Sequence, residues 1–222
     1  MAATRSGASS GARTDGRVAR GNETRALILK RAVDLASVEG LDGLSLGRLA
    51  GELKLSKSGV FALFGSKEDL QLATVRAAVK VYVQHVVRPA SELPPGIDRV
   101  WHLCLNWLAY SRERVFPGGC FFYAAAAEFD AREGKVHDAL ATARADWRAH
   151  VEETVREGQA AGEIDGDADV PQLVFELLAF LEMANAESVL HGESVSYDRA
   201  AHAALTRLRT VATDPSSLPE SP

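Results

Sequence analysis

The stretch 45–64, S-L-G-R-L-A-G-E-L-K-L-S-K-S-G-V-F-A-L-F, predicts two short helices joined by a tight turn. Apolar residues in its first half recur at i, i+3, i+4 and i+7, which places them on one helical face. They are Leu46, Leu49, Ala50 and Leu53. Ser45 and Ser56 stand where N-caps belong, ready to accept from the free amides of each first turn. Val60 and Phe64, four residues apart, give the second helix its buried side.

The rest of the second helix faces outward and carries small, basic or flat side chains. These are Lys57, Ser58, Gly59, Phe61, Ala62 and Leu63. A short helix with such a face can enter the major groove of DNA. The spacing alone leaves a second interpretation open, an ordinary helical hairpin in an all-α core, because helix-turn-helix patterns are short and weakly specific.

The flanking segments favour the DNA-binding interpretation. Downstream, Ser66 and Asp69 form an S-x-x-D capping box that predicts the start of another helix. Upstream, residues 25–39 form an amphipathic pattern that ends at Gly40. The text A-V-D-L-A-S-V-E-G-L-D-G-L-S-L-G-R-L-A, followed by L-S-K-S-G-V-F-A-L-F-G-S-K-E-D-L, resembles the TetR family of bacterial transcriptional repressors over about 50 residues.

Two positions depart from the family pattern. Lys54 occupies a turn position that is usually Gly, and a Cβ there carries a steric cost if φ is positive. Phe61 occupies a position that is usually Tyr, so any phosphate contact made by that hydroxyl is absent. Both departures change the expected contacts with DNA.

The resemblance implies an all-α fold of about nine helices, in which a three-helix DNA-binding domain precedes a larger ligand-binding and dimerisation domain. We expect a disordered basic arm at 1–21, the helix-turn-helix domain at 22–82, the effector and dimerisation domain at 83–212, and a disordered tail at 213–222. The expected DNA contacts are Ser45, Arg48, Ser56, Lys57, Ser58, Gly59, Phe61, Ala62, Leu63 and Lys67, with both lysines on phosphates.

The function implied is that of a homodimeric repressor on near-palindromic double-stranded DNA, which a small effector releases. The charge distribution agrees with this expectation although the formal net charge is -5. Residues 1–70 carry eleven Lys and Arg against eight Asp and Glu, whereas the remaining residues carry 14 against 22. Such an asymmetry suits nucleic acid at one end of the protein. The alternative function does not involve DNA: the protein would be an interaction adaptor, and its helical hairpin would bind a helix.

Later segments predict further helices, including 67–88 stopped by Pro89, 171–190, and one capped by Ser196. The helix at 67–88 would belong to both domains and could transmit a signal between them. The helix at 171–190 has more apolar residues than one buried face requires, so it and the helix after it are expected to form the dimer, with Phe180 and Leu181 in the contact.

Aromatic residues concentrate between 101 and 175, and the resemblance suggests that some line an effector pocket. The candidates are Trp101, Cys104, Trp107, Cys120, Phe121, Trp147 and Phe175. An aromatic lining with few charges suits an apolar or aromatic effector. The alternative is plain core packing.

Cys120 follows Gly118 and Gly119 at a predicted helix start, where the helix dipole favours thiolate. A redox-sensing regulator or a small cysteine-dependent enzyme are therefore alternatives, although no His base accompanies the thiol in a local signature. The third alternative is that Cys120 is a buried structural thiol. We expect no catalytic residue, and therefore no enzyme.

Neither a cofactor nor a metal is expected. Asp165, Asp167 and Asp169 imitate part of a calcium loop, but Val170 stands where that loop needs Gly. Two cysteines do not make a disulfide framework and suit a reducing cytoplasm. No apolar run reaches about 18 residues, so we expect no membrane span and a cytoplasmic protein.

Overall fold

The computed structural model describes residues 10–222, with side chains from Ala19 onward. Within that range the chain is helical and contains no strand, apart from one isolated antiparallel bridge between Ile164 and Ala212. The all-α prediction is confirmed. The elements are α1 (Ser10–Glu39), α2 (Leu46–Glu52), α3 (Lys57–Phe64), α4 (Lys67–Tyr82), the π-helical turn η1 (Val83–Val87), α5 (Arg88–Ser91), α6 (Ile97–Arg112), α7 (Phe121–Phe129), α8 (Lys135–Ala160), α9 (Val170–His191), α10 (Val195–Arg209) and the 3-10 turn η2 (Pro215–Ser217).

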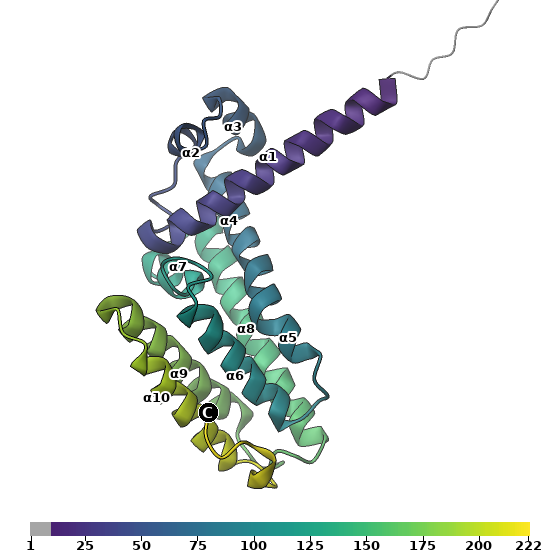
Figure 1. Cartoon of the computed structure of the whole chain (residues 1–222), viewed down its shortest axis with the longest axis vertical. Helices are drawn as coiled ribbons and strands as arrows, with labels where there is room; N and C mark the ends of the chain where they lie inside the picture. The colour runs from purple at the N-terminus through teal and green to yellow at the C-terminus, as the bar shows by residue number, and fades with distance from the viewer. Residues whose placement is uncertain (1–9) are drawn as a thin grey trace, which may run out of the picture.

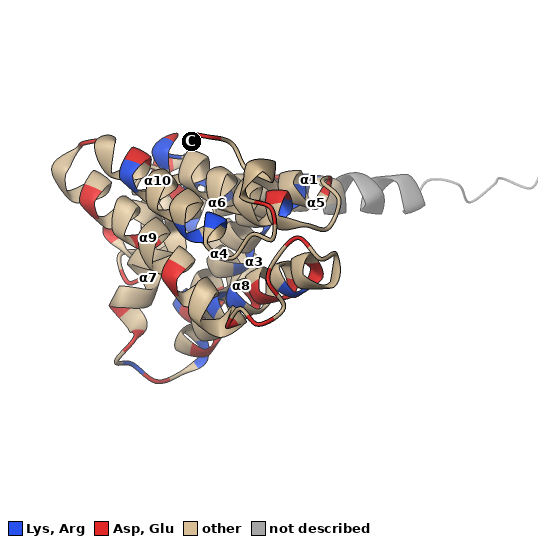
Figure 2. Cartoon of the chain, turned by 90° about the horizontal axis from the view of Figure 1, so that it is seen from below, with Lys and Arg blue, Asp and Glu red and all other residues tan. Residues whose placement is uncertain are grey.

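Two units share one long helix. The N-terminal unit consists of α1, α2, α3 and the start of α4, and α1 projects beyond it (Figure 1). The remaining helices form an elongated body below it, in which α9 packs along α10 and both pack against α6. Seen from the end remote from α2 and α3, acidic residues mark several loops of the body (Figure 2).

The N-terminal unit forms from local capping signals, as predicted. The Ser45 hydroxyl accepts from the Arg48 amide at 3.1 Å, and the Ser56 hydroxyl accepts from the Gly59 amide at 3.1 Å. The Ser66 hydroxyl accepts from the Asp69 amide at 3.0 Å. Each bond satisfies a donor that a helix start leaves free. Below the caps, buried apolar residues hold α2 and α3 together: Leu49, Ala50, Val60 and Phe64.

Pro89 does not stop the long helix, contrary to the prediction. Helical backbone continues from α4 through η1 into α5, where Pro89 lies in the first turn. Proline lacks an N–H and its ring clashes with the carbonyl four residues earlier in an α-helix. The π-helical turn ends with the Arg88 amide donating to the Val83 carbonyl, one residue further back than in an α-helix. This wider turn lets the proline be accommodated. With α4, η1 and α5 counted as one segment and the 3-10 turn η2 left out, residues 10–222 contain nine helices, in agreement with the expected number of about nine.

Two segments at the chain ends differ from prediction. The disordered arm predicted at 1–21 is wrong for residues 10–21, because α1 begins at Ser10; residues 1–9 lie outside the described range. A helix already nucleated extends at little cost through Ala and Arg, which are good helix formers. The tail at 213–222 is not disordered either, since Leu218 is buried and the Thr213 hydroxyl donates to the Gly162 carbonyl at 2.8 Å.

Ser196 does not cap the last long helix. Ser194 holds the N-cap position without a side-chain hydrogen bond, and Ser196 lies one residue inside α10. Its hydroxyl donates to the Ala184 carbonyl on α9 at 3.0 Å. Ser196 therefore links α10 to α9 and does not cap α10. No helix of the described chain is both long and apolar enough to cross a membrane.

Candidate nucleic-acid interface and effector site

The outer face of α3 is open, as predicted. Phe61 is 57% exposed, and Lys57, Ser58 and Ala62 are also exposed. With Leu46 and Gly47 of α2 these four side chains line a shallow depression of about 460 Å³. Lys57 has no ion-pair partner within 4 Å among the described residues. The outer face of α3 thus presents the unpaired ammonium group of Lys57 together with the exposed ring of Phe61.

Other residues predicted to contact DNA either cap a helix or are partly buried. Ser45 and Ser56 are engaged as N-caps, and Leu63 is half-buried. At Gly59 a Cβ would lie 2.8 Å from the Ser56 hydroxyl, so glycine keeps that cap tight. Lys54 adopts φ 55°, so the steric cost that was expected there for a positive φ applies.

Arg48 and Lys67, both predicted to meet DNA, are engaged within the protein. Arg48 is held between Glu39 and Glu52, and its hydrogen bonds lower the pKa of Glu39. The Lys67 ammonium donates to the carbonyl of Asp42 at 2.7 Å and to its carboxylate at 3.2 Å. Such exposed pairs are weak, so DNA could compete for them, but neither cation is free as Lys57 is.

Arg25 fixes the far end of α3, which the sequence did not reveal. Its guanidinium donates to the Leu63 carbonyl at 2.5 Å and lies 4.5 Å above the ring of Phe64. A cation at a helix C-terminus is favourable because carbonyls there lack partners. The contact joins α1 to the exposed helix across 38 residues of sequence.

A second contact joins the N-terminal unit to α7 independently of α4. The Glu128 carboxylate accepts from the Leu41 amide at 2.7 Å and from the Asp42 amide at 2.9 Å. Nearby, the Gly118 amide donates to the Ser37 hydroxyl at 3.1 Å. A Cβ on Gly118 would lie 1.8 Å from the Ser37 carbonyl oxygen, so only glycine permits this approach. We call the pair of Glu128 bonds the Glu128 clasp.

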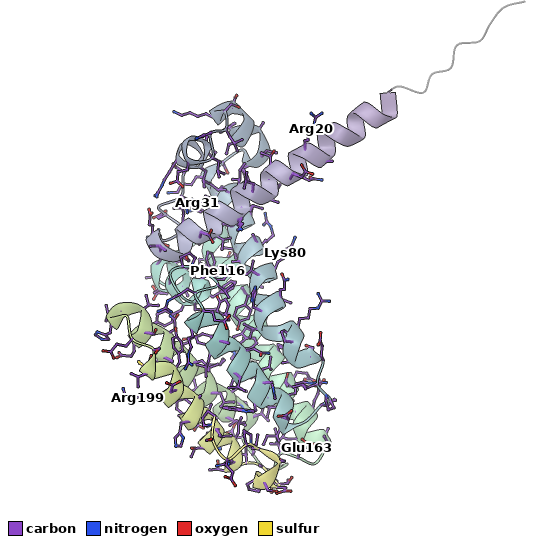
Figure 3. All side chains as sticks on the ribbon, in the orientation of Figure 1. Arg20, Arg31, Lys80, Phe116, Glu163 and Arg199 are labelled. Carbon is purple, nitrogen blue, oxygen red and sulfur yellow. The ribbon has the colours of Figure 1, made fainter. Side chains whose placement is uncertain are left out.

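An aromatic cluster lies in the body, and three of the predicted pocket residues belong to it: Trp107, Phe121 and Trp147. Phe116 marks its position in Figure 3. Tyr82 makes edge-to-face contacts with Tyr110, Phe122 and Trp147, at centroid distances of 5.4, 5.5 and 5.3 Å. Among the predicted residues, those buried or half-buried in the connected core are Trp101, Cys104, Trp107, Cys120, Phe121 and Trp147.

Phe175 does not belong to this cluster, contrary to the prediction. It is 69% exposed on the outer face of α9. The row it starts continues at helical spacing through Met183 and Leu190, which are 60% and 76% exposed. Leu181, expected in the dimer contact, is only 1% exposed and belongs to the protomer's own core. Alanines of α10 also face inward: Ala200, Ala201 and Ala204.

Two hydroxyls in the cluster are buried without a hydrogen bond of good geometry to the described residues. They are those of Tyr82, which has Trp107 as its polar neighbour, and of Tyr110, which has Cys120 and the Phe121 backbone. Burial raises the pKa of both phenols, so both remain protonated. An unsatisfied buried hydroxyl costs roughly 1–3 kcal/mol, so these polar neighbours reduce the cost of burying the two phenols.

The Cys120 thiol is buried, and burial raises its pKa despite its place at the start of α7. The expectation that the helix dipole would favour thiolate is therefore wrong, because desolvation outweighs the helix start. The Cys120 amide donates to the Asn185 side-chain oxygen at 2.7 Å, which anchors α7 to α9. Burial likewise raises the pKa of Cys104 to about 12.

Comparisons with known families agree with this architecture. The model described as "Bacterial regulatory proteins, tetR family" matches residues 28–74, and the one described as "Tetracyclin repressor-like, C-terminal domain" matches residues 96–204. The chain belongs to the TetR family. Members of this family are DNA-binding transcriptional regulators that respond to ligands. No curated protein sequence matches the chain significantly.

Solved structures share the fold of this TetR-family chain at low sequence identity. A TetR regulator from Chloroflexus aurantiacus is 23% identical, with a TM-score of 0.78, over 87% of this chain and 98% of that one. A regulator from Saccharomonospora viridis in complex with choline is 20% identical, with a TM-score of 0.72, over 87% and 100%. AibR in complex with isovaleryl coenzyme A and operator DNA is 15% identical, with a TM-score of 0.60, over 75% and 93%.

Proposed function

We propose that this regulator binds a near-palindromic operator as a homodimer and releases it when a small apolar or aromatic effector enters the C-terminal body. The observation that carries the proposal is the open face of α3, with the uncommitted Lys57 beside the exposed Phe61. AibR, which shares the fold, was solved with both operator DNA and an acyl coenzyme A, so this architecture supports both kinds of ligand.

On DNA, α3 would lie in the major groove. Lys57 at its start would contact a phosphate, and Ser58, Gly59, Phe61 and Ala62 would face base or sugar edges. Phe61 has no hydroxyl, so its contribution would be apolar, as with a thymine methyl group. Arg48 and Lys67 would reach phosphates only by exchanging their intramolecular partners.

The exposed row on α9 supports a dimer. Phe175, Met183 and Leu190 span about four turns of the helix, and their large apolar side chains are exposed. Monomeric proteins rarely expose such a continuous row. Two copies packed through α9, with the polar edge of α10 at the rim, would bury on the order of 2,000 Å². Dimerisation would set the spacing of the two α3 helices on the operator.

The release signal would reach α3 by two routes. One is α4, which starts in the N-terminal unit and carries Tyr82 into the aromatic cluster. The other is the Glu128 clasp, which holds the loop before α2. A ligand that favours one arrangement of these contacts over another shifts the DNA-binding equilibrium by that difference in affinity.

The test is selection of genomic DNA fragments by the purified full-length protein, followed by titration of the selected fragment at several salt concentrations. A sequence-specific binder enriches a near-palindromic site, and its affinity falls steeply with salt as counterions are released. Lack of any enriched sequence would reject the DNA-binding proposal and favour the adaptor alternative.

A further inference from the structure

The shallow depression between α2 and α3 is mostly apolar, although it lies on the face proposed to meet DNA. Its apolar lining consists of Leu46 and Gly47 from α2 with Phe61 and Ala62 from α3. The ring of Phe61 is 57% exposed, so it is open to a partner. Apolar surface of this kind gains free energy when an apolar group of the partner covers it.

The recognition helix α3 is poor in side chains that read bases through paired hydrogen bonds. Such contacts are made by Arg or Lys to guanine and by Asn or Gln to adenine, and the sequence of α3, K-S-G-V-F-A-L-F, contains no Arg, Asn or Gln. Arg48 of α2 is held between Glu39 and Glu52. Lys57 is the first residue of α3, where the proposed function places it on a phosphate. Ser58 can bond to several bases, so it discriminates poorly between them.

Only one group that DNA presents in its major groove is an alkyl group, the C5-methyl of thymine; the others are hydrogen-bond donors and acceptors. A donor or acceptor pressed against Phe61 and Ala62 would lose its water without gaining a partner, which is unfavourable. A thymine methyl has no such cost. Because the depression is shallow and open, it fits the edge of a base that stays stacked in the duplex.

We infer that this depression holds the C5-methyl group of a thymine in each half-site, against the ring of Phe61 and over Gly47. Phe61 is then a specificity-determining residue, and the base pair that it faces is T·A. This inference rests on the proposed function, because it names the base that the same DNA face reads.

The test replaces each thymine of the selected operator in turn by uracil, in both half-sites at once. Uracil lacks only the C5-methyl group and keeps the same hydrogen-bonding edge. The Kd of the full-length protein is measured by fluorescence anisotropy. At one thymine position the replacement should weaken binding by roughly fourfold per half-site, and therefore by roughly 15-fold in total.

Two variants of α3 separate the methyl contact from general affinity for DNA. Phe61→Ala should bind the thymine and uracil operators equally, because the ring that covers the methyl is gone. Phe61 is exposed, so this variant should keep the wild-type Tm. Lys57→Ala should weaken binding to both operators and preserve the ratio of their Kd values, because a phosphate contact does not depend on the base.

A pair of glycine variants in α2 tests the depression itself. A Cβ on Gly47 would meet only the Lys57 side chain, at 3.9 Å, so Gly47→Ala fits within the protein and adds a methyl to the depression. Its affinity for the thymine operator should fall by roughly fivefold, and the uracil operator should then bind at least as well. Gly51→Ala is the matched control, because Gly51 lies outside the depression and a Cβ there would meet no atom of the described residues within 4 Å. Both variants gain helix propensity, so neither should lower the Tm.

Three results would each overturn the thymine contact: a half-site without an A·T pair, uracil replacements that all leave the Kd unchanged, or a thymine preference that survives in Phe61→Ala. All three require an enriched operator, so they leave the proposed function standing. A selection without any enriched sequence is a different result, because it would reject the proposed function and the thymine contact with it.

Discussion

Replacing Glu128 with Gln should loosen the N-terminal unit from α7 while leaving both units folded. The carboxylate accepts from the Leu41 and Asp42 amides at 2.7 and 2.9 Å. Gln keeps the shape but offers one neutral acceptor, and its NH₂ group faces one of the two backbone donors. The clasp therefore loses its charge and one hydrogen bond.

The magnitude follows from the type of bond. Hydrogen bonds to a charged group contribute about 1.5–3 kcal/mol each, and partial exposure of Glu128 reduces this through solvent screening. We expect the local free energy of opening to fall by about 2 kcal/mol, which corresponds to roughly 30-fold faster amide exchange. Gly118 and Ser37 still tie α7 to α1, so the global Tm should change little.

The assay is hydrogen exchange of peptides that contain Leu41 and Asp42, with Asp130→Asn as the control. Asp130 is exposed just after α7, and its side chain makes no hydrogen bond or ion pair with any residue from 10 to 222. The exchange rate should rise in Glu128→Gln and stay at the wild-type value in Asp130→Asn. Unchanged exchange in Glu128→Gln would refute the reasoning, since it would mean that the clasp does not limit opening of this loop.

Three further predictions concern the DNA face, the dimer and the thiols. Lys57→Ala should weaken binding to all DNA sequences alike and lower the salt slope by about one unit, whereas unchanged affinity and slope would remove Lys57 from the interface. Met183→Glu should give monomers with a near-native Tm in sedimentation, whereas Leu181→Glu should unfold the protomer by burying a charge; a persistent Met183→Glu dimer would exclude the α9 row. Iodoacetamide at pH 8 should label Cys120 far more slowly in the folded protein than in urea, because burial raises its folded pKa and keeps the thiol protonated; equal rates would revive the redox-sensor alternative.

Local signals predicted the N-terminal unit well. Ser45, Ser56 and Ser66 cap their helices because a cap depends only on the next three residues, and the positive φ of Lys54 follows from its place in the turn. Such features involve near neighbours in sequence, so one chain without relatives reveals them.

The errors arose where distant residues decide the outcome. Arg48 and Lys67 are predicted to contact DNA, and no local pattern indicated that Glu39 and Asp42 would pair with them once α1 folds against α2 and α4. Glu128 binds a loop 87 residues away, and no local pattern marks it. Phe175 has the composition of a pocket residue, and only the direction in which α9 packs shows that it faces outward.

The wide turn at 83–87 gives part of the long helix a way to shift along its axis and rotate while remaining helical. Each carbonyl in such a turn accepts from an amide five residues on, so the helix holds one extra residue there. If that extra residue migrates toward α3 by exchange of hydrogen-bond partners, each residue it passes advances by about 1.5 Å and turns by about 100°. Pro89 has no amide hydrogen to take part in such an exchange, so it closes the downstream direction. Slippage would therefore run only toward the N-terminal unit.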